Sequence, residues 1–230
     1  MAFLELLTGS GLGSLLGMRH ALEPDHLAAV STLLTGERNH AKAAWLGACW
    51  GVGHTVTLVA VGGALVLFRA KMPPGASDAF ELAVAVMLVG LGSRSVYRAA
   101  REGVDGPTYL HRHGAVVHAH AGVPAHVHVG RWTLARRPLL VGAVHGLAGS
   151  GALTALVLAA LPSTAARLTY MALFGAGSTI GMAALSGALG WPIGHLARRP
   201  GLARGLSMAV GCGTTLLGVW WGYPLVGRIF

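Results

Sequence analysis

The chain has 230 residues, of which 53% are hydrophobic and only 11% are charged. Soluble domains carry about a quarter charged residues, so this composition excludes an ordinary soluble globular protein. No polar stretch is long enough to form a second, soluble domain. The formal net charge is +9, but the basic residues cluster in the loops between apolar segments. We therefore expect a lipid bilayer, and not nucleic acid, as the partner of this basic chain.

Six apolar segments have about the length of a membrane-spanning helix, which needs roughly twenty residues. They cover residues 3–34, 43–68, 80–97, 139–161, 165–189 and 205–226. No basic stretch precedes the first segment, so we expect no cleaved signal peptide. The sequence predicts an all-α, multi-pass protein of the cell (inner) membrane.

The basic residues are distributed unequally between the two sides of these six predicted helices. Eleven lie in loops on one side, whereas the other side holds four, namely Arg69, Lys71, Arg167 and Arg228. Cytoplasmic loops are enriched in lysine and arginine. We therefore expect the side with eleven to face the cytoplasm and both termini to lie outside.

The first apolar segment is interrupted by the stretch "RHALEPDH" at residues 19–26. Ionisable side chains at membrane depth are costly and mark functional sites. Proline lacks an N–H, and its ring opposes the preceding helical turn, so we expect the helix to break at Pro24. Such a break would bring His20, Asp25 and His26 around one centre.

Imidazole and carboxylate groups together suit a divalent transition metal such as Ni²⁺, Co²⁺ or Zn²⁺, whereas Ca²⁺ and Mg²⁺ prefer oxygen ligands. His54, in the glycine-flanked "GVGHT" of the second segment, is the expected further ligand. His145, in "VHGLAGSG", is either a fifth ligand or a packed polar residue, because its neighbours supply no carboxylate. Arg19 and Glu23 are four residues apart and are predicted to form an ion pair that steadies the helix.

The two halves of the chain resemble each other. "WGVGHT" at 50–55 matches "FGAGST" at 174–179, "VGLGSR" at 89–94 matches "VGCGTT" at 210–215, and the segment of His20 matches that of His145. Each half has an odd number of predicted helices, so the second should be inverted relative to the first. We predict one repeat at 1–104, a loop at 105–137 and a second repeat at 138–230. His20 and His145 should approach each other on the pseudo-two-fold axis.

The loop between the repeats contains paired histidines in "HRHGAVVHAHAGVPAHVHVG". A spacing of two places both members of a pair on one face of a strand. We expect a hairpin in which "VVHAH" and "AHVHV" flank the turn "AGVP". Its face would form a second, cytoplasmic metal site of His118, His120, His126 and His128. A disordered loop without this function is the alternative.

The pattern "HALEPDH" at 20–26 resembles the H-x-x-x-x-D-H signature of the nickel/cobalt transporter superfamily. "GHT" at 53–55 is similar to its second motif, and "VHGLAGSGALTAL" and "LFGAGSTIGMA" resemble its six-helix branch, which includes membrane urease accessory proteins. The similarity covers nearly the whole chain and implies that His20, Asp25, His26 and His54 carry the metal. The larger eight-helix permeases have a phenylalanine–aspartate–threonine motif where this chain has "VHGLAGSG".

The sequence thus predicts a transporter of nickel or cobalt, with zinc as a further candidate, and not an enzyme. The resemblance favours uptake over efflux. We expect no cofactor besides the transported ion; the oligomeric state, a homo-oligomer included, stays open. One alternative is a membrane factor that delivers nickel to an enzyme such as urease without net flux. Another is a redox carrier using Cys49 and Cys212, whose wide separation in sequence argues against it.

Overall fold

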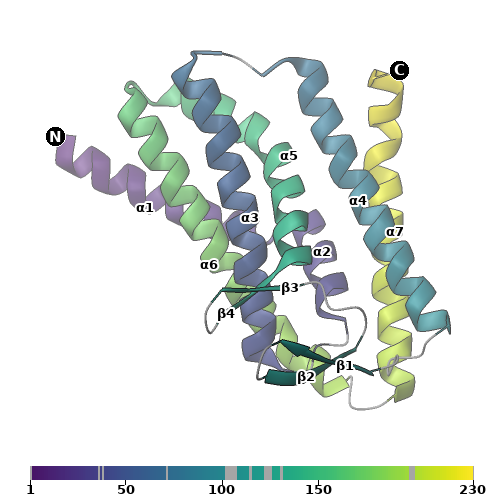
Figure 1. Ribbon diagram of the computed structural model, residues 1–230. Helices are drawn as coiled ribbons and strands as arrows, with labels where there is room; N and C mark the ends of the chain where they lie inside the picture. Colours follow the sequence, from purple (N-terminus) through teal and green to yellow (C-terminus); the bar gives the residue numbers. More distant parts are fainter. Residues whose placement is uncertain are drawn as a thin grey trace.

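The computed structural model describes residues 2–35, 37, 39–70, 72–101, 108–113, 116–121, 126–129, 132–196 and 200–229. Within these ranges, side chains are not described for 2–10, 74, 108–134, 150–159 and 200. This part of the chain forms seven helices and four strands (Figure 1). The helices are α1 (Ala2–His20), α2 (Pro24–Leu34), α3 (His40–Leu67), α4 (Pro74–Arg101), α5 (Arg136–Ala160), α6 (Thr164–Leu196) and α7 (Pro200–Ile229). The strands are β1 (Thr108–His113), β2 (Val116–Ala121), β3 (His126–Val129) and β4 (Trp132–Ala135).

All six apolar segments predicted from the sequence are helical. The first is split, because α1 ends at His20 and α2 begins at Pro24. Proline is favoured at a first helical position, where no N–H partner is needed. Within the described ranges, four helices are long and apolar enough to cross a membrane: His40–Leu67, Gly75–Arg101, Thr164–Leu196 and Gly201–Ile229. The protein is therefore a helical, polytopic membrane protein.

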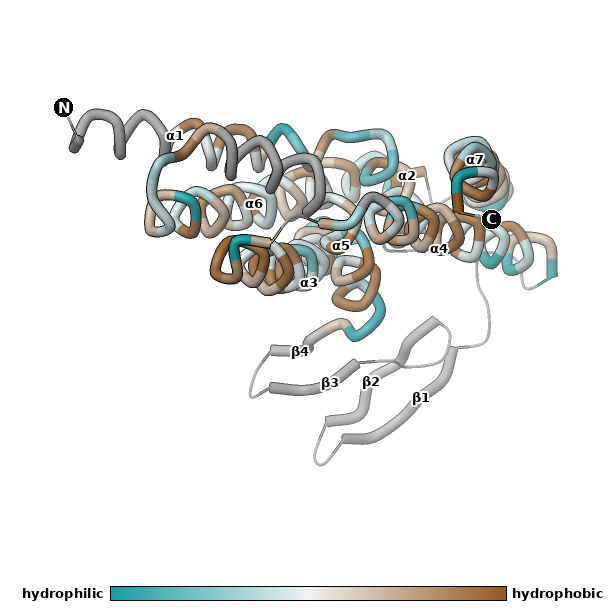
Figure 2. Tube along the Cα trace, turned by 90° about the horizontal axis from the view of Figure 1, so that it is seen from above, coloured by the Kyte–Doolittle hydropathy of each residue, from teal (hydrophilic) through white to brown (hydrophobic). Residues whose placement is uncertain are grey.

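The helices pack in pairs that link the two halves of the chain. α3 lies along α6, and α4 lies along α7, as both views of the molecule show (Figures 1 and 2). α1 packs on α6 and α5 packs on α3. Hydrophobic positions occur on all sides of these helices (Figure 2), as expected where one side meets protein and the other meets lipid.

Glycines bring helix backbones into direct contact at several interfaces. Four of these contacts form two corresponding pairs, in which a Cβ would collide with a backbone carbonyl of the neighbouring helix; the glycines are Gly17 (on Phe174), Gly142 (on Trp50), Gly53 (on Leu139) and Gly177 (on Ser14). The first two contacts correspond to each other, and so do the last two, at a shift of 124 or 125 residues. The α1–α6 and α5–α3 interfaces are thus built from equivalent residues of the two halves.

The segment between α4 and α5 contains two separate antiparallel hairpins, which add short strands to an otherwise all-α fold. β1 pairs with β2, placing His111 opposite His118, and β3 pairs with β4, placing His126 opposite Ala135. The predicted hairpin between 116–120 and 125–129 is therefore wrong. Within each observed hairpin only two residues separate the strands, the connection length that hairpins favour most. Thus His118 and His120 lie in one hairpin, His126 and His128 lie in the other, and their side chains are outside the described part.

Candidate metal centre

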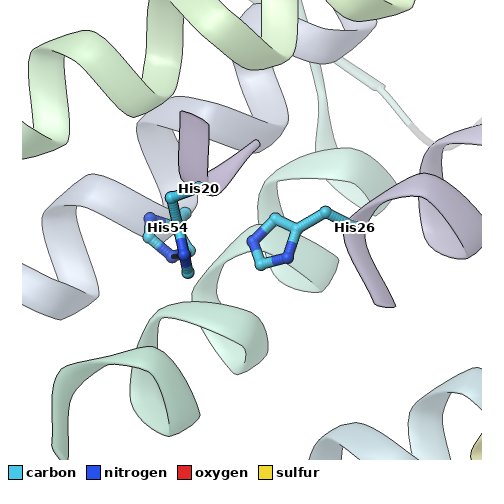
Figure 3. A group of neighbouring side chains, drawn as sticks. All are labelled: His20, His26 and His54. Carbon is cyan, nitrogen blue, oxygen red and sulfur yellow. Dashed lines mark hydrogen bonds between the residues drawn. The ribbon is translucent and has the colours of Figure 1, made fainter. Parts of the chain in front are cut away.

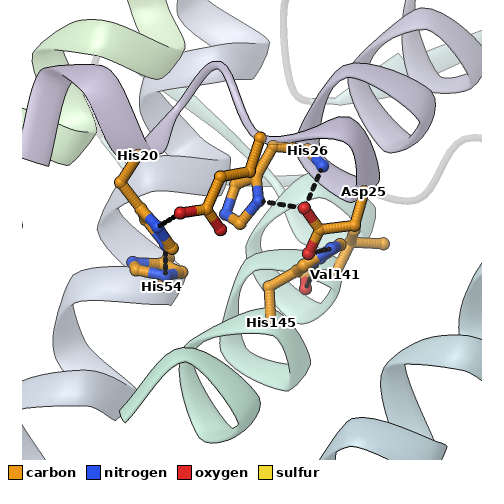
Figure 4. A network of polar contacts seen from close by, with 7 residues as sticks. His20, Asp25, His26, His54, Val141 and His145 are labelled. Atoms are coloured by element: carbon orange, nitrogen blue, oxygen red, sulfur yellow. Dashed lines mark hydrogen bonds and ion pairs between the residues drawn. The ribbon is translucent and has the colours of Figure 1, made fainter. Parts of the chain in front are cut away.

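The break in the first segment brings ionisable residues from three parts of the chain together. His20 is the last residue of α1, and Asp25 and His26 lie in the first turn of α2. α3 contributes His54 and α5 contributes His145 (Figure 4). The cluster is buried, since the exposed fraction is 8% for Asp25, 2% for His26, 0% for His54 and 1% for His145. All five residues predicted as ligands at membrane depth therefore lie in one cluster.

Three histidines form one half of this cluster (Figure 3). The Nε2 atoms of His20 and His54 are 3.3 Å apart. The ring of His26 lies 4.5 Å from that of His20 and 5.6 Å from that of His54, between centroids. One ligand atom from each of these residues lies within 4.8 Å of the other two. This separation allows the three imidazoles to share one ion.

Asp25 holds His26 in a defined orientation. Its Oδ1 accepts a hydrogen bond from the backbone N–H of His26, at 2.9 Å, and lies 2.9 Å from Nδ1 of the same residue. An ionised carboxylate only accepts, so Nδ1 of His26 carries the hydrogen. The buried Nε2 atom of His26 has no hydrogen-bond partner in the described part of the chain. A lone pair is therefore free at Nε2 of His26.

His145 approaches Asp25 from the other side. Its Nδ1 lies 3.3 Å from the carbonyl oxygen of Val141, one turn earlier in α5, and donates to it. Its Nε2 lies 3.5 Å from Oδ2 of Asp25 and forms no hydrogen bond with any described residue. Histidine ligands of metals commonly donate their second ring N–H to a carbonyl in this way. His145 thus has the orientation expected of a ligand.

Two contacts of the cluster were missed by the sequence reasoning. Glu23, predicted to pair with Arg19, places its Oε1 2.9 Å from Nδ1 of His20. The ring of Trp50 lies 5.3 Å from that of His26 and 5.6 Å from that of His145. The sequence did contain a signal for the second contact, because the repeat aligns Trp50 with another aromatic residue, Phe174. Nothing in the sequence showed whether Glu23 would pair with Arg19 or with His20.

His20 and His145, predicted to approach each other, both lie beside His26. The ring of His26 is 4.5 Å from that of His20 and 4.7 Å from that of His145 between centroids. Phe174 packs on His20 at 5.4 Å, as Trp50 packs on His145 at 5.6 Å. The two histidines thus have equivalent aromatic neighbours.

The chemistry of the cluster fits a borderline divalent ion. Buried polar atoms are costly unless they are paired, yet ring nitrogens of His26, His54 and His145 have no partner among the described residues. Four imidazoles and one carboxylate match the ligands preferred by nickel, cobalt and zinc. A positive ion bound at Nε2 of His26 and at Nε2 of His145 would satisfy two of these nitrogens, whereas the unpartnered nitrogen of His54 is Nδ1.

Comparison with known proteins agrees with this chemistry. Residues 7–211 match the model of the NicO family, described as high-affinity nickel-transport protein. The chain is also 30% identical over 221 residues to the urease accessory protein UreH of Bacillus sp. (strain TB-90), a match that covers 96% of this chain and 93% of that protein. No solved structure matches. The resemblance seen in the sequence is therefore confirmed, and the chain belongs to the NicO family.

Proposed function

We propose that the protein carries a divalent nickel or cobalt ion across the membrane, in the direction of uptake. The proposed ligands are His20, Asp25, His26, His54 and His145. The observation that supports this most directly is the group of unpartnered ring nitrogens buried beside a carboxylate at a helix break. Binding requires neutral imidazoles, and buried charges are tolerated only when they are paired or bound to metal.

We further propose that the chain spans the membrane six times, as two inverted three-helix repeats at 1–104 and 138–230. The equivalent glycine contacts of α1–α6 and α5–α3 support this arrangement. Inverted repeats with a site near the midplane, at interrupted helices, recur in secondary transporters. By the distribution of basic residues, both termini lie outside and residues 105–137 lie in the cytoplasm.

The histidines of the cytoplasmic segment form a second, weaker metal site in this proposal. His118, His120, His126 and His128 are the proposed residues, now divided between two hairpins. Histidine-rich segments bind metal through their density of imidazoles. The site would collect or buffer metal at the cytoplasmic mouth.

Nickel flux into and out of proteoliposomes, with cobalt and zinc as competitors, tests the transport function. We expect His20→Ala, Asp25→Ala and His26→Ala each to abolish flux at matched amounts of folded protein. His195→Ala replaces an exposed histidine at the end of α6 and serves as the matched control, with unchanged flux. Wild-type flux in all three cluster variants would disprove the assignment of the site.

The name of the relative UreH supports a second candidate function, delivery of nickel to a cytosolic enzyme without net flux. In that case the purified protein binds nickel through the same residues, but proteoliposomes accumulate none in either direction. The two measurements made on one preparation therefore separate the candidates.

A further inference from the structure

We propose that the cluster contains two metal positions and that the transported ion passes from one to the other. This inference rests on the proposed function and deepens it. The first position lies between Nε2 atoms of His20, His26 and His54. The second lies between Oδ2 of Asp25 and Nε2 of His145. The contact between Asp25 and His26 joins them.

The geometry of the first position is that of a three-histidine site. Nδ1 of His20 faces Glu23, and Nδ1 of His26 faces Asp25, each at 2.9 Å, so both Nε2 atoms carry a lone pair. Nε2 of His26 has no partner among the described residues, and Nε2 of His20 shares a hydrogen bond with Nε2 of His54, which a bound ion would replace. In a tetrahedral zinc site, with metal–nitrogen bonds of about 2.0–2.1 Å, two ligand nitrogens are roughly 3.3 Å apart, and they lie closer together in the square-planar or octahedral sites that nickel also adopts. The Nε2 atoms of His20 and His54 are 3.3 Å apart. Figure 3 shows the ring of His26 turned toward this pair.

The second position consists of two acceptors that face each other without a hydrogen between them. Nδ1 of His145 donates to Val141, so its Nε2 carries a lone pair, and Oδ2 of Asp25 lies 3.5 Å away. Two acceptors repel at this distance unless a cation lies between them. The separation is again close to the roughly 3.3–3.6 Å expected between two ligand atoms of one tetrahedral zinc ion. Because His145 is only 1% exposed, bulk water does not compensate its unpartnered nitrogen.

The two carboxylate oxygens of Asp25 face different histidines. For this reason we propose two metal positions and not one. Oδ1 of Asp25 is held by His26 and Oδ2 faces His145 (Figure 4). In the first position Asp25 therefore acts on the metal through His26, and in the second it binds the metal directly. Two divalent ions so close together would repel strongly, so we expect one ion per chain.

The test compares equilibrium binding with flux in the full-length chain. Its background replaces the six loop histidines by asparagine: His111, His113, His118, His120, His126 and His128. Nickel affinity is measured by calorimetry in detergent, and flux is measured in proteoliposomes. The variants are His54→Ala for the first position, His145→Ala and His145→Asn for the second, and His195→Ala as the control.

We expect His54→Ala to lower nickel affinity by about tenfold or more and to abolish flux. Both His145 variants should keep one ion per chain, with affinity within about threefold of the background, yet lose at least about tenfold in flux. Equal loss of affinity in the His54 and His145 variants would overturn the proposal in favour of a single site. Normal flux in the His145 variants would also overturn it.

X-ray absorption on the background protein gives an answer that does not depend on these variants. At less than one nickel per chain we expect three imidazoles around the ion, and four would overturn the proposal by placing His145 in the first position. Absence of flux in the wild type would instead disprove the transport function, and the transfer between positions with it.

Discussion

Thr55 and Thr179, 124 residues apart, place their hydroxyl oxygens 2.9 Å from each other across the interface of α3 and α6. Both oxygens are also within 2.9 Å of the carbonyl oxygen of Gly175. Each hydroxyl can donate to the carbonyl of Gly175, and either can donate to the other hydroxyl, so two hydrogens are shared among three close contacts. The pair occupies equivalent positions of the two half-chain motifs, where a pseudo-two-fold axis would pass.

This pair predicts a measurable but modest coupling. Interhelical hydrogen bonds in membrane proteins contribute about 0.6 kcal/mol on average, and each single valine variant leaves the other hydroxyl bonded to Gly175. We expect Thr55→Val and Thr179→Val to be coupled by roughly this amount in a double-mutant cycle. Unfolding in mixed detergent measures it, and strictly additive effects would show that the two hydroxyls do not interact.

Alanine at Gly142 should damage the metal centre through the backbone. Its Cβ would meet the carbonyl of Trp50 and the amide nitrogen of His54, neither of which can move independently of α3. We expect Gly142→Ala to separate α5 from α3 and to lower nickel binding strongly. Gly213→Ala is the control, because a Cβ there has nothing described within 4 Å, and alanine is favoured over glycine in helices by about 1 kcal/mol. If both variants bound nickel equally well, the close contact of Gly142 with α3 would be contradicted.

Removal of the charge at Glu23 should weaken nickel binding without removing a ligand. The carboxylate lies 2.9 Å from Nδ1 of His20, where it orients the ring and increases the basicity of Nε2. We expect Glu23→Gln to lower affinity by about tenfold, while Glu81→Gln, the same change in α4, leaves affinity unchanged. Calorimetry on the loop-substituted protein measures the nickel affinity of both variants. Unchanged affinity in Glu23→Gln would show that Glu23 does not contribute to nickel binding.

Nickel affinity at the membrane site should fall as the pH falls. Protons compete with metal for the same ring nitrogens, and an ordinary histidine titrates near pH 6.5. Affinity is therefore highest above the histidine pKa values and decreases below them, by about tenfold per pH unit for each imidazole that must lose a proton. Titrations from pH 8 to about pH 5 measure this, and constant affinity over that range would exclude histidine ligands.

Replacement of His118, His120, His126 and His128 by asparagine should change transport only when nickel is scarce. The loop site is proposed to collect metal and is separate in sequence from the proposed ligands at the helix break. We expect normal flux at saturating nickel and reduced flux at low nickel. Complete loss of flux in correctly inserted protein would place these histidines on the transport route itself.

The positions of the proposed ligands were predictable because they depend on strong local signals. Pro24 cannot continue the helix of His20, and charged residues in an apolar segment are too costly to lack a role. His54 and His145 were found by their glycine-rich surroundings and by the internal repeat. In the structure these residues, each found from a separate local signal, lie in one cluster.

Other features depend on choices that sequence patterns do not resolve. Glu23 lies four residues after Arg19 and three residues after His20, so either could be its partner. It pairs with His20 because the chain is unwound between α1 and α2. The predicted strand pairing of the loop was wrong. The spacing of the histidines indicates which face of a strand they occupy, but it does not indicate which strand pairs with it. The position of His26 beside both His20 and His145 depends on the angle between α1 and α2, which the spacing of residues in the sequence does not give.

The glycine contacts have a mechanical consequence. Helix backbones in direct contact have little space between them for rearrangement, so we expect α1, α6, α3 and α5 to move together as one block. A second block joins α4 and α7, where Gly92 lies against Gly211 and Gly218 against the carbonyl of Ala85. α2 contains no glycine, is attached to α1 through a short unwound link, and packs between the two blocks on α7, α4 and α6. The helix best able to tilt is thus the one that holds Asp25 and His26, so movement of a single short segment could displace the bound ion while the rest of the protein stays still.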